Sequence, residues 1–345
     1  MTTMEQRARK PWYQYRNTLP PNLLDLAHYL QTRMMATLQN ECGHDRLRLG
    51  FAPYITLIGD RDYRPTELAE ALGISRQACN QALRQVESAG YIGYIPDPQD
   101  GRAKLLTLTD EGRRLRRNGI DVVAGLDNEF MALLSESEIQ AAGIALGTLT
   151  NALSLGPVTQ GSADTGYRGM GGLLPRMGEH ILQRLMALTK ARGHPGLKLS
   201  FGQVIPHIGA GGGRIQAIAA LHDVSKQAIS AIAKELEELG YISREPDPDD
   251  ARQLVLRFTA RGEQLMLDAT SSLDELETEL ASIVGDATYG RLSATLARLH
   301  SALALGSAGT VAAHDVNIEL LAEQLQQQLG TTHSRALGRL LAGND

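Results

Sequence analysis

The sequence predicts a mainly helical protein with small β-sheets, organised as two copies of one domain. The first observation is length, since 345 residues exceed the roughly 150 residues of an ordinary domain. The second is an internal repeat, and the third is the order of helical and strand-like patterns within each copy. Hydrophobic residues make up 43% of the chain, which is enough to build apolar cores.

A fixed offset of 150 residues relates the two copies. Residues 75–112 and 225–262 share 15 identities over 38 positions without a gap. The repeat extends over about 130 residues, so it is a whole domain rather than one unit of a solenoid. The predicted organisation is a first domain at 1–153, a Gly-rich linker at 154–172, a second domain at 173–303 and a C-terminal helical extension at 304–345.

Apolar spacing predicts the first helices of the repeat. Residues 23–39 carry leucines and a methionine at helical intervals, and a short helix is expected at 51–58. Pro65 is placed to open a third helix that ends at Gly73. Ser75 is expected to cap the next helix, 75–89, through its hydroxyl. The short gap between these last two helices is typical of a helix-turn-helix.

Strand-like alternation follows at 91–95 and 103–109, joined by the polar loop PDPQDGR. Two long helical patterns then cover 110–134 and 136–153, with Ser135 as the expected cap between them. A helix-turn-helix followed by a two-stranded hairpin is a winged helix. The predicted fold is therefore two winged helix-turn-helix domains, each with long helices beside the winged helix.

The wing carries the most specific motif, D-x-R followed six residues later by L-T-x-x-G. It occurs as Asp100-Gly101-Arg102 with Leu108-Thr109 and Gly112, and again as Asp250-Ala251-Arg252 with Phe258-Thr259 and Gly262, where Phe258 departs from the usual Leu. On these residues each copy resembles the multiple-antibiotic-resistance regulator (MarR) family. The resemblance implies a dimeric winged-helix transcription factor with a helical dimerisation region, so the two copies are expected to pair as an intramolecular pseudo-dimer. It also implies a regulator that is commonly a repressor, released from DNA by a small aromatic or phenolic anion.

Polar side chains on the helix after the turn, together with basic residues of the wing, are the candidates for DNA contact. Arg pairs with guanine and amide side chains pair with adenine in the major groove, and the wing arginine is expected in the minor groove. The candidates are Ser75, Arg76, Gln77, Asn80, Gln81, Arg84, Arg102 and Lys104 in the first copy, and Ser225, Lys226, Gln227, Ser230, Lys234 and Arg252 in the second.

The two copies are expected to contribute unequally to DNA binding. Gln81 becomes Ala231, which offers at most a methyl contact to a base. Residues 61–117 hold 10 Lys/Arg and 8 Asp/Glu, a balance of +2, whereas the matching residues 211–267 hold 7 and 9, a balance of −2. Since phosphate contacts dominate affinity, the first copy should bind more strongly.

The remaining candidates are weaker. His28, Tyr54 and His207 could face an effector pocket, an expectation that rests on the family resemblance alone. Cys79 aligns with Ile229 and is expected to be a core residue, and Cys42 near His44 does not match a zinc-site spacing. No cofactor and no metal are expected. Without a recognisable nucleophile–base pair, the chain is not expected to be an enzyme.

Double-stranded DNA and a small-molecule effector are the expected partners. No apolar run reaches the roughly 20 residues of a membrane helix, so a cytoplasmic location without membrane contact is expected. The chain could be a monomer or a homodimer of chains. Two other hypotheses stay open: a ligand-binding or protein-interacting module that has lost DNA binding, favoured by the net charge of −5, and a cysteine-based redox sensor.

Overall fold

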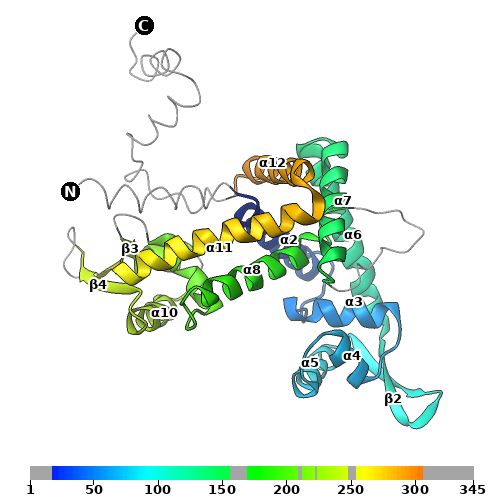
Figure 1. Ribbon diagram of the computed structural model, residues 1–345. Coiled ribbons are helices and arrows are strands. Elements are labelled where there is room, and N and C mark those ends of the chain that lie inside the picture. Colours follow the sequence, from blue (N-terminus) through cyan, green and yellow to red (C-terminus); the bar gives the residue numbers. More distant parts are fainter. Residues whose placement is uncertain (1–17, 156–168, 209–211, 222–223, 248–253, 306–345) are drawn as a thin grey trace. The chain divides into compact units, whose positions relative to one another are not determined.

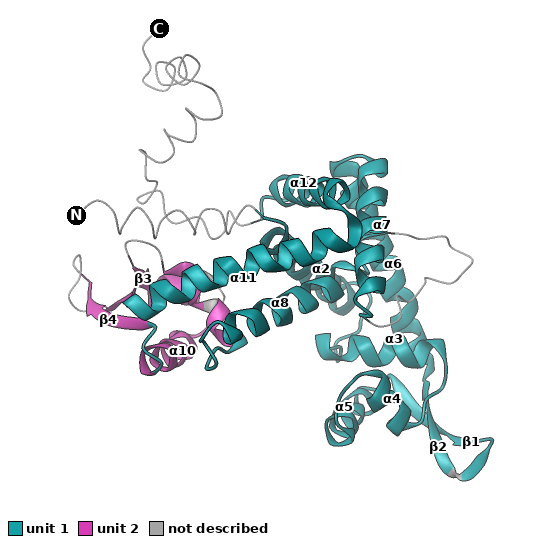
Figure 2. Cartoon of the chain, viewed as in Figure 1, with its two compact units in different colours: residues 1–199, 239–241, 259–305 teal, residues 200–238, 242–258, 306–345 magenta. Residues whose placement is uncertain are grey.

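The computed structural model describes residues 18–155, 169–208, 212–221, 224–247 and 254–305 (Figure 1). These residues fall into two compact units (Figure 2). Unit 1 takes the described residues of 1–199, 239–241 and 259–305, and unit 2 takes those of 200–238, 242–258 and 306–345. Unit 1 therefore holds the long helices of both copies with the first winged helix, and unit 2 is the second winged helix.

The first copy follows the predicted order of elements. Its helices are α2 (Leu19–Asn40), the 3-10 turn η1 (Leu49–Phe51), α3 (Ala52–Asp60), α4 (Pro65–Ala71), α5 (Arg76–Ser88), α6 (Asp110–Leu133) and α7 (Glu136–Ala152). The wing strands are β1 (Ile92–Asp97) and β2 (Asp100–Leu108), which pair antiparallel with Ile92 opposite Leu108. Gly73 follows α4 with a φ of +65° and ends this helix, as the sequence predicts.

The second copy repeats this order with one difference. Its elements are α8 (Leu174–Ala191), the 3-10 turns η2 (Leu199–Gln203) and η3 (Ile205–His207), β3 (Gly213–Arg214), α9 (Ile215–Leu221), α10 (Lys226–Glu238), β4 (Ile242–Pro246), β5 (Leu254–Phe258), α11 (Ala260–Val284) and α12 (Asp286–Ala302). Where the first copy has α3, the second has two short turns. Pro206 explains this, because proline lacks an N–H and clashes with the preceding helical turn. His207 therefore lies on the 3-10 turn η3 and not on an α-helix like α3.

The wing of unit 2 gains a strand that the sequence did not predict. The sheet order is β3-β5-β4, with Gly213 opposite Leu256. In the first copy the corresponding contact is a single bridge between Tyr63 and Leu106. Both arrangements tie the segment before the helix-turn-helix to the wing.

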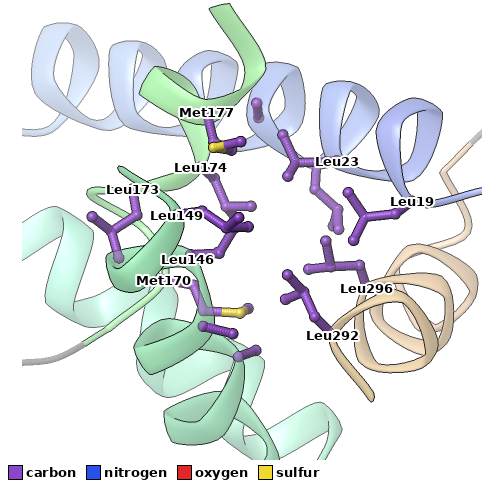
Figure 3. Close-up of a cluster of buried hydrophobic side chains, with 14 of the residues drawn as sticks. Leu19, Leu23, Leu146, Leu149, Met170, Leu173, Leu174, Met177, Leu292 and Leu296 are labelled. Atoms are coloured by element: carbon purple, nitrogen blue, oxygen red, sulfur yellow. The ribbon is translucent and has the colours of Figure 1, made fainter. Parts of the chain in front are cut away.

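Helices of both copies build one apolar core in unit 1. α2 packs against α8, and α12 packs against both α2 and α7. Figure 3 shows the side chains that meet there, among them Leu19 and Leu23 of α2, Met177 of α8 and Leu296 of α12. Each of these four is fully buried. Because leucines from each copy fill the same interior, this core is shared by the long helices of both copies.

A second core lies within the first winged helix. Leu68, Leu83, Val86 and Leu106 are its most buried members, contributed by α4, α5 and β2. This core fixes the helix-turn-helix against the wing. None of the helices among the described residues combines the length and apolar character that a membrane span requires.

Candidate nucleic-acid interface

Helix α5 separates a buried stripe from an exposed polar row. Cys79, Leu83 and Val86 are buried, which orients the helix on the winged-helix core. The Ser75 hydroxyl accepts the Ala78 N–H at 3.2 Å and caps the helix, as predicted. The six residues predicted to contact bases or phosphates all lie exposed on this helix or its cap: Ser75, Arg76, Gln77, Asn80, Gln81 and Arg84.

Helix α10 of unit 2 repeats this arrangement with fewer polar groups. The Ser225 hydroxyl accepts the Ala228 N–H at 3.1 Å, and Ser225, Lys226 and Gln227 are exposed. Ser230 is half-buried, and Ala231 occupies the exposed place of Gln81. The Lys234 ammonium lies 3.8 Å from the Glu238 carboxylate, so part of its charge is offset within the helix.

Of the three basic wing residues predicted to contact DNA, the structure describes one with its side chain. Lys104 is exposed on β2. Arg102 lies on the same strand, and the structure describes its backbone only. Arg252 lies outside the described residues.

Sequence reasoning missed an ion pair that fixes each wing. The Arg64 guanidinium, just before α4, donates to the Asp97 carboxylate at 2.5 and 2.8 Å. The Asp97 carboxylate also accepts the Gln99 N–H at 2.8 Å, and this bond and Arg64 hold its pKa below the usual range. Arg214 and Asp247 form the same pair in unit 2, at 2.5 and 3.2 Å. The signal was available, because Arg64 and Asp97 recur at the offset of 150.

The L-T-x-x-G motif closes the winged helix onto α6. The Thr109 hydroxyl donates to Gly90 O at 2.6 Å and accepts the Gly112 N–H at 3.0 Å, which caps α6. A Cβ on Gly112 would lie 2.0 Å from Tyr91 O, so only glycine fits. Thr259 makes the same two bonds, to Gly240 O at 2.6 Å and from Gly262 N at 3.2 Å. The motif is therefore a structural clasp that sets the wing against the long helix.

A buried histidine lies beside each clasp. His44 is 1% exposed, and its Nδ1 lies 3.0 Å from Glu111 Oε1. Burial, and then the neighbouring Arg114, lower the pKa of His44. Its counterpart His194 contacts the Tyr241 hydroxyl and the Asp268 carboxylate, both at 3.1 Å. These contacts fit a structural role better than a metal site.

The three effector candidates lie in different surroundings. Tyr54 is buried in the core of the first winged helix. His207 is half-buried on η3. His28 is exposed and lines an open hollow of about 400 Å³ with Gln31, Thr32, Met35, Ala36, Gln39, Asn40 and Leu49.

The surroundings of Cys79 do not favour a reactive thiol. Cys79 is fully buried, its Sγ lies 3.8 Å from Pro65 O, and burial raises the pKa of its thiol. A buried thiol with a raised pKa is a poor nucleophile, as expected for the counterpart of Ile229. In the described part of the chain, no three His, Cys, Asp or Glu side chains are grouped to hold a metal ion.

The sequence matches a known family model twice. The model of the MarR family matches residues 55–103 and 203–253, which run from α3 and η2 into the wings. A protein of Thauera aromatica, named for transcriptional regulation of the hcr operon, is 30% identical over 84 residues. That match covers 24% of this chain and 51% of the relative, so the chain spans about half the length of this curated protein.

Solved regulators resemble the chain over about the length of one copy. The transcriptional regulator Tm0710 of Thermotoga maritima is 21% identical with a TM-score of 0.31, and the alignment covers 37% of this chain and 92% of that one. A MarR-family regulator of Rhodococcus sp. RHA1 is 24% identical, with a TM-score of 0.33 and coverages of 42% and 98%. CouR of Rhodococcus jostii RHA1, solved with p-coumaroyl-CoA, is 23% identical, with a TM-score of 0.32 and coverages of 45% and 100%.

The family model matches both copies over the helix-turn-helix and into the wing, where the repeated caps and ion pairs lie. The chain therefore carries, in tandem, two regions that match the MarR family.

Proposed function

We propose that this protein is a transcriptional regulator whose single chain supplies both DNA-binding halves of a pseudo-dimer. The observation that carries the proposal is the exposed polar row of α5 beside the wing, repeated at the same offset on α10. Winged-helix dimers bind operators whose two half-sites mirror the symmetry of the protein. The name of the Thauera aromatica relative supports a role in transcription.

The two halves of the proposed operator differ in sequence. Gln77 and Gln227 are both exposed and can read the same base in each half-site. Asn80 and Gln81 of α5 are replaced by Ser230 and Ala231, which cannot make bidentate contacts to adenine. The operator is therefore a pseudo-palindrome with one shared position in each half.

We further propose repression relieved by a small aromatic or phenolic acid. The family resemblance suggests this effector class, and the hollow beside His28 is the place among the described residues that best fits it. The imidazole of His28 would face a carboxylate or phenolate there. Replacing His28 with Ala should weaken the effector response and leave DNA binding without effector unchanged.

Selection of sites from genomic fragments by the purified full chain tests the proposal. We expect one class of asymmetric sites, bound with a steep salt dependence. Repeating the selection with a panel of aromatic acids tests release. Failure to enrich any site would favour the alternative of a ligand-binding or protein-interacting module, and equal ranking of perfect palindromes would contradict unequal halves.

A further inference from the structure

Among the described residues of unit 1, four polar contacts join helices of the first copy to helices of the second copy or to the segment just before them. In two of them a buried or half-buried carboxylate accepts a backbone N–H near the start of a helix, and the other two are ion pairs between helices. The pairs are Asp127 with Gly171, Glu277 with Leu19, Asp25 with His300, and Glu138 with Arg298. In three of these pairs the partners come from different copies, and Gly171 ends the linker that leads into α8, so the contacts bear on which halves can pair.

The contact between Asp127 and Gly171 is the most demanding. Asp127, on α6, is fully buried, and its two carboxylate oxygens lie 3.0 and 3.2 Å from the Gly171 nitrogen, which donates its N–H. A buried carboxylate without donors is costly, so this N–H is needed. Space is also limited, because a Cβ on Gly171 would lie 2.9 Å from Val123 and 3.2 Å from Asp127. The position requires both a backbone donor and a missing side chain.

The first copy has neither at the matching position. The offset of 150 carries Gly171 onto Pro21 and Met170 onto Pro20. Proline has no N–H to donate, and its ring would occupy the space that Gly171 leaves free. If two first copies paired with each other, Asp127 would face Pro20 and Pro21 in place of Met170 and Gly171. The N–H that the first copy offers nearby is that of Leu19, which lies 3.4 Å from the carboxylate of Glu277, a side chain one methylene longer than that of Asp127. The buried carboxylate therefore disfavours this pairing.

The crossing of α2 and α8 adds a steric reason. A Cβ on Gly178 would lie 3.1 Å from the Cβ of Ala27, closer than most such contacts. The residue of the first copy at this position is His28. A pair of first copies would thus place an imidazole where the unlike pair has a hydrogen atom.

The ion pairs act against a pair of second copies. His300 Nε2 lies 2.9 Å from Asp25 Oδ2, and Arg298 pairs with Glu138. The offset carries Asp25 onto Pro175 and Glu138 onto Thr288. In a pair of second copies, His300 and Arg298 would lose both carboxylate partners.

We propose that the helical surfaces of this chain are built for unlike pairing, so that a first copy associates only with a second copy, of its own chain or of another. The inference does not depend on DNA binding. The inference distinguishes this chain from a fusion of two interchangeable halves, in which like pairs would form as readily as unlike pairs.

The test starts from the full chain with a protease site inserted in residues 156–168. After cleavage the halves are unfolded together in urea and refolded, and native mass spectrometry separates the three possible pairs by mass. We expect the unlike pair to dominate and each like pair to be at least about ten-fold less abundant than random pairing would give. The reason is that the free energy lost by burying a charge without a partner is larger than the free energy of a tenfold change in an equilibrium constant. A random mixture overturns the proposal. So does a failure of the halves to pair when the uncut chain, treated identically, refolds.

A reciprocal pair of variants in the uncut chain tests the molecular basis. Gly171→Pro gives the second copy the residue of the first, and Pro21→Gly makes the opposite change at the matching site. We expect Gly171→Pro to lower Tm by several degrees, at least about twice the shift of Pro21→Gly, because only the former removes the donor from a buried carboxylate. Equal shifts would overturn the role of Asp127.

Discussion

Two glycines of α6 show how one residue can fix the geometry of a domain. Gly112 lies against Tyr91 O, where an added Cβ would approach to 2.0 Å, whereas a Cβ on Gly119 meets nothing within 4 Å. We expect Gly112→Ala to reduce the free energy of unfolding by about 1–3 kcal/mol through overpacking. Gly119→Ala should instead raise it by up to about 1 kcal/mol, since alanine favours the helix. Urea unfolding of both variants checks this, and similar effects of the two would contradict it.

The exposed cations of the two recognition helices allow a matched comparison. Arg84 of α5 corresponds to Lys234 of α10, and Lys234 already lies 3.8 Å from Glu238. We expect Arg84→Ala to weaken DNA binding about ten-fold and Lys234→Ala by no more than about three-fold, because a paired lysine gives less to phosphate. Affinities measured at two salt concentrations decide it. Equal losses would argue against a stronger first half.

At the scale of elements, the ion pair at the base of each wing is expected to set the wing's orientation. Arg64→Ala removes the partner of Asp97 without touching the recognition helix. We expect faster hydrogen exchange in β1 and β2 and about a 3–10-fold loss of DNA affinity, since an unfixed wing must be ordered on binding. Arg33→Ala is the control, because its pair with Glu129 is exposed at 3.3 Å and joins α2 to α6 rather than the wing. Unchanged exchange in the wing would refute this role.

The elements themselves were largely predictable from the sequence, for local reasons. Ser75, Thr109 and Ser135 all cap helices, and Ser135 with Glu138 forms a capping box. The exception is the segment around Pro206, where a single proline outweighs the similarity of the repeat.

The long-range partners in the candidate site were not predictable from spacing. Arg64 and Asp97 are 33 residues apart and meet only once the wing has folded back. Their recurrence at the offset of 150 was visible, but recurrence alone does not say which residues touch. The exposed row of α5 was predictable, because its alternation with Cys79, Leu83 and Val86 is local.

At the scale of the molecule, the shared core of unit 1 changes the meaning of the repeat. The sequence divides into two similar domains, yet helices of both copies bury their leucines in one interior. Cooperative unfolding of unit 1 should therefore involve residues of both copies. The contacts that join the copies are asymmetric, and one of them introduces a titratable group into this core.

Asp127 should make the stability of unit 1 depend on pH in an unusual direction. Burial raises the pKa of its carboxyl to about 6, against an ordinary value of 3.8, while the N–H groups of Gly171 and Met170 oppose the shift. Between these values the folded chain holds a proton that the unfolded chain releases. The contribution of Asp127 to the unfolding free energy therefore increases as pH falls from about 7 to about 4, by up to about 3 kcal/mol at about 1.4 kcal/mol per pKa unit.

Substitution isolates this contribution from that of the other acids, which destabilise the fold at low pH. Asp127→Asn removes the titration, so the stability of the wild type relative to this variant should rise as pH falls through 6. Asp121→Asn, which removes an exposed acid from the same helix, is the control for lost charge. The comparison is made by urea unfolding at pH 4, 5, 6 and 7. If the difference in unfolding free energy between wild type and Asp127→Asn stays constant with pH, the buried carboxylate keeps its ordinary pKa. That result would contradict the view that burial outweighs the hydrogen bonds in setting the pKa of Asp127.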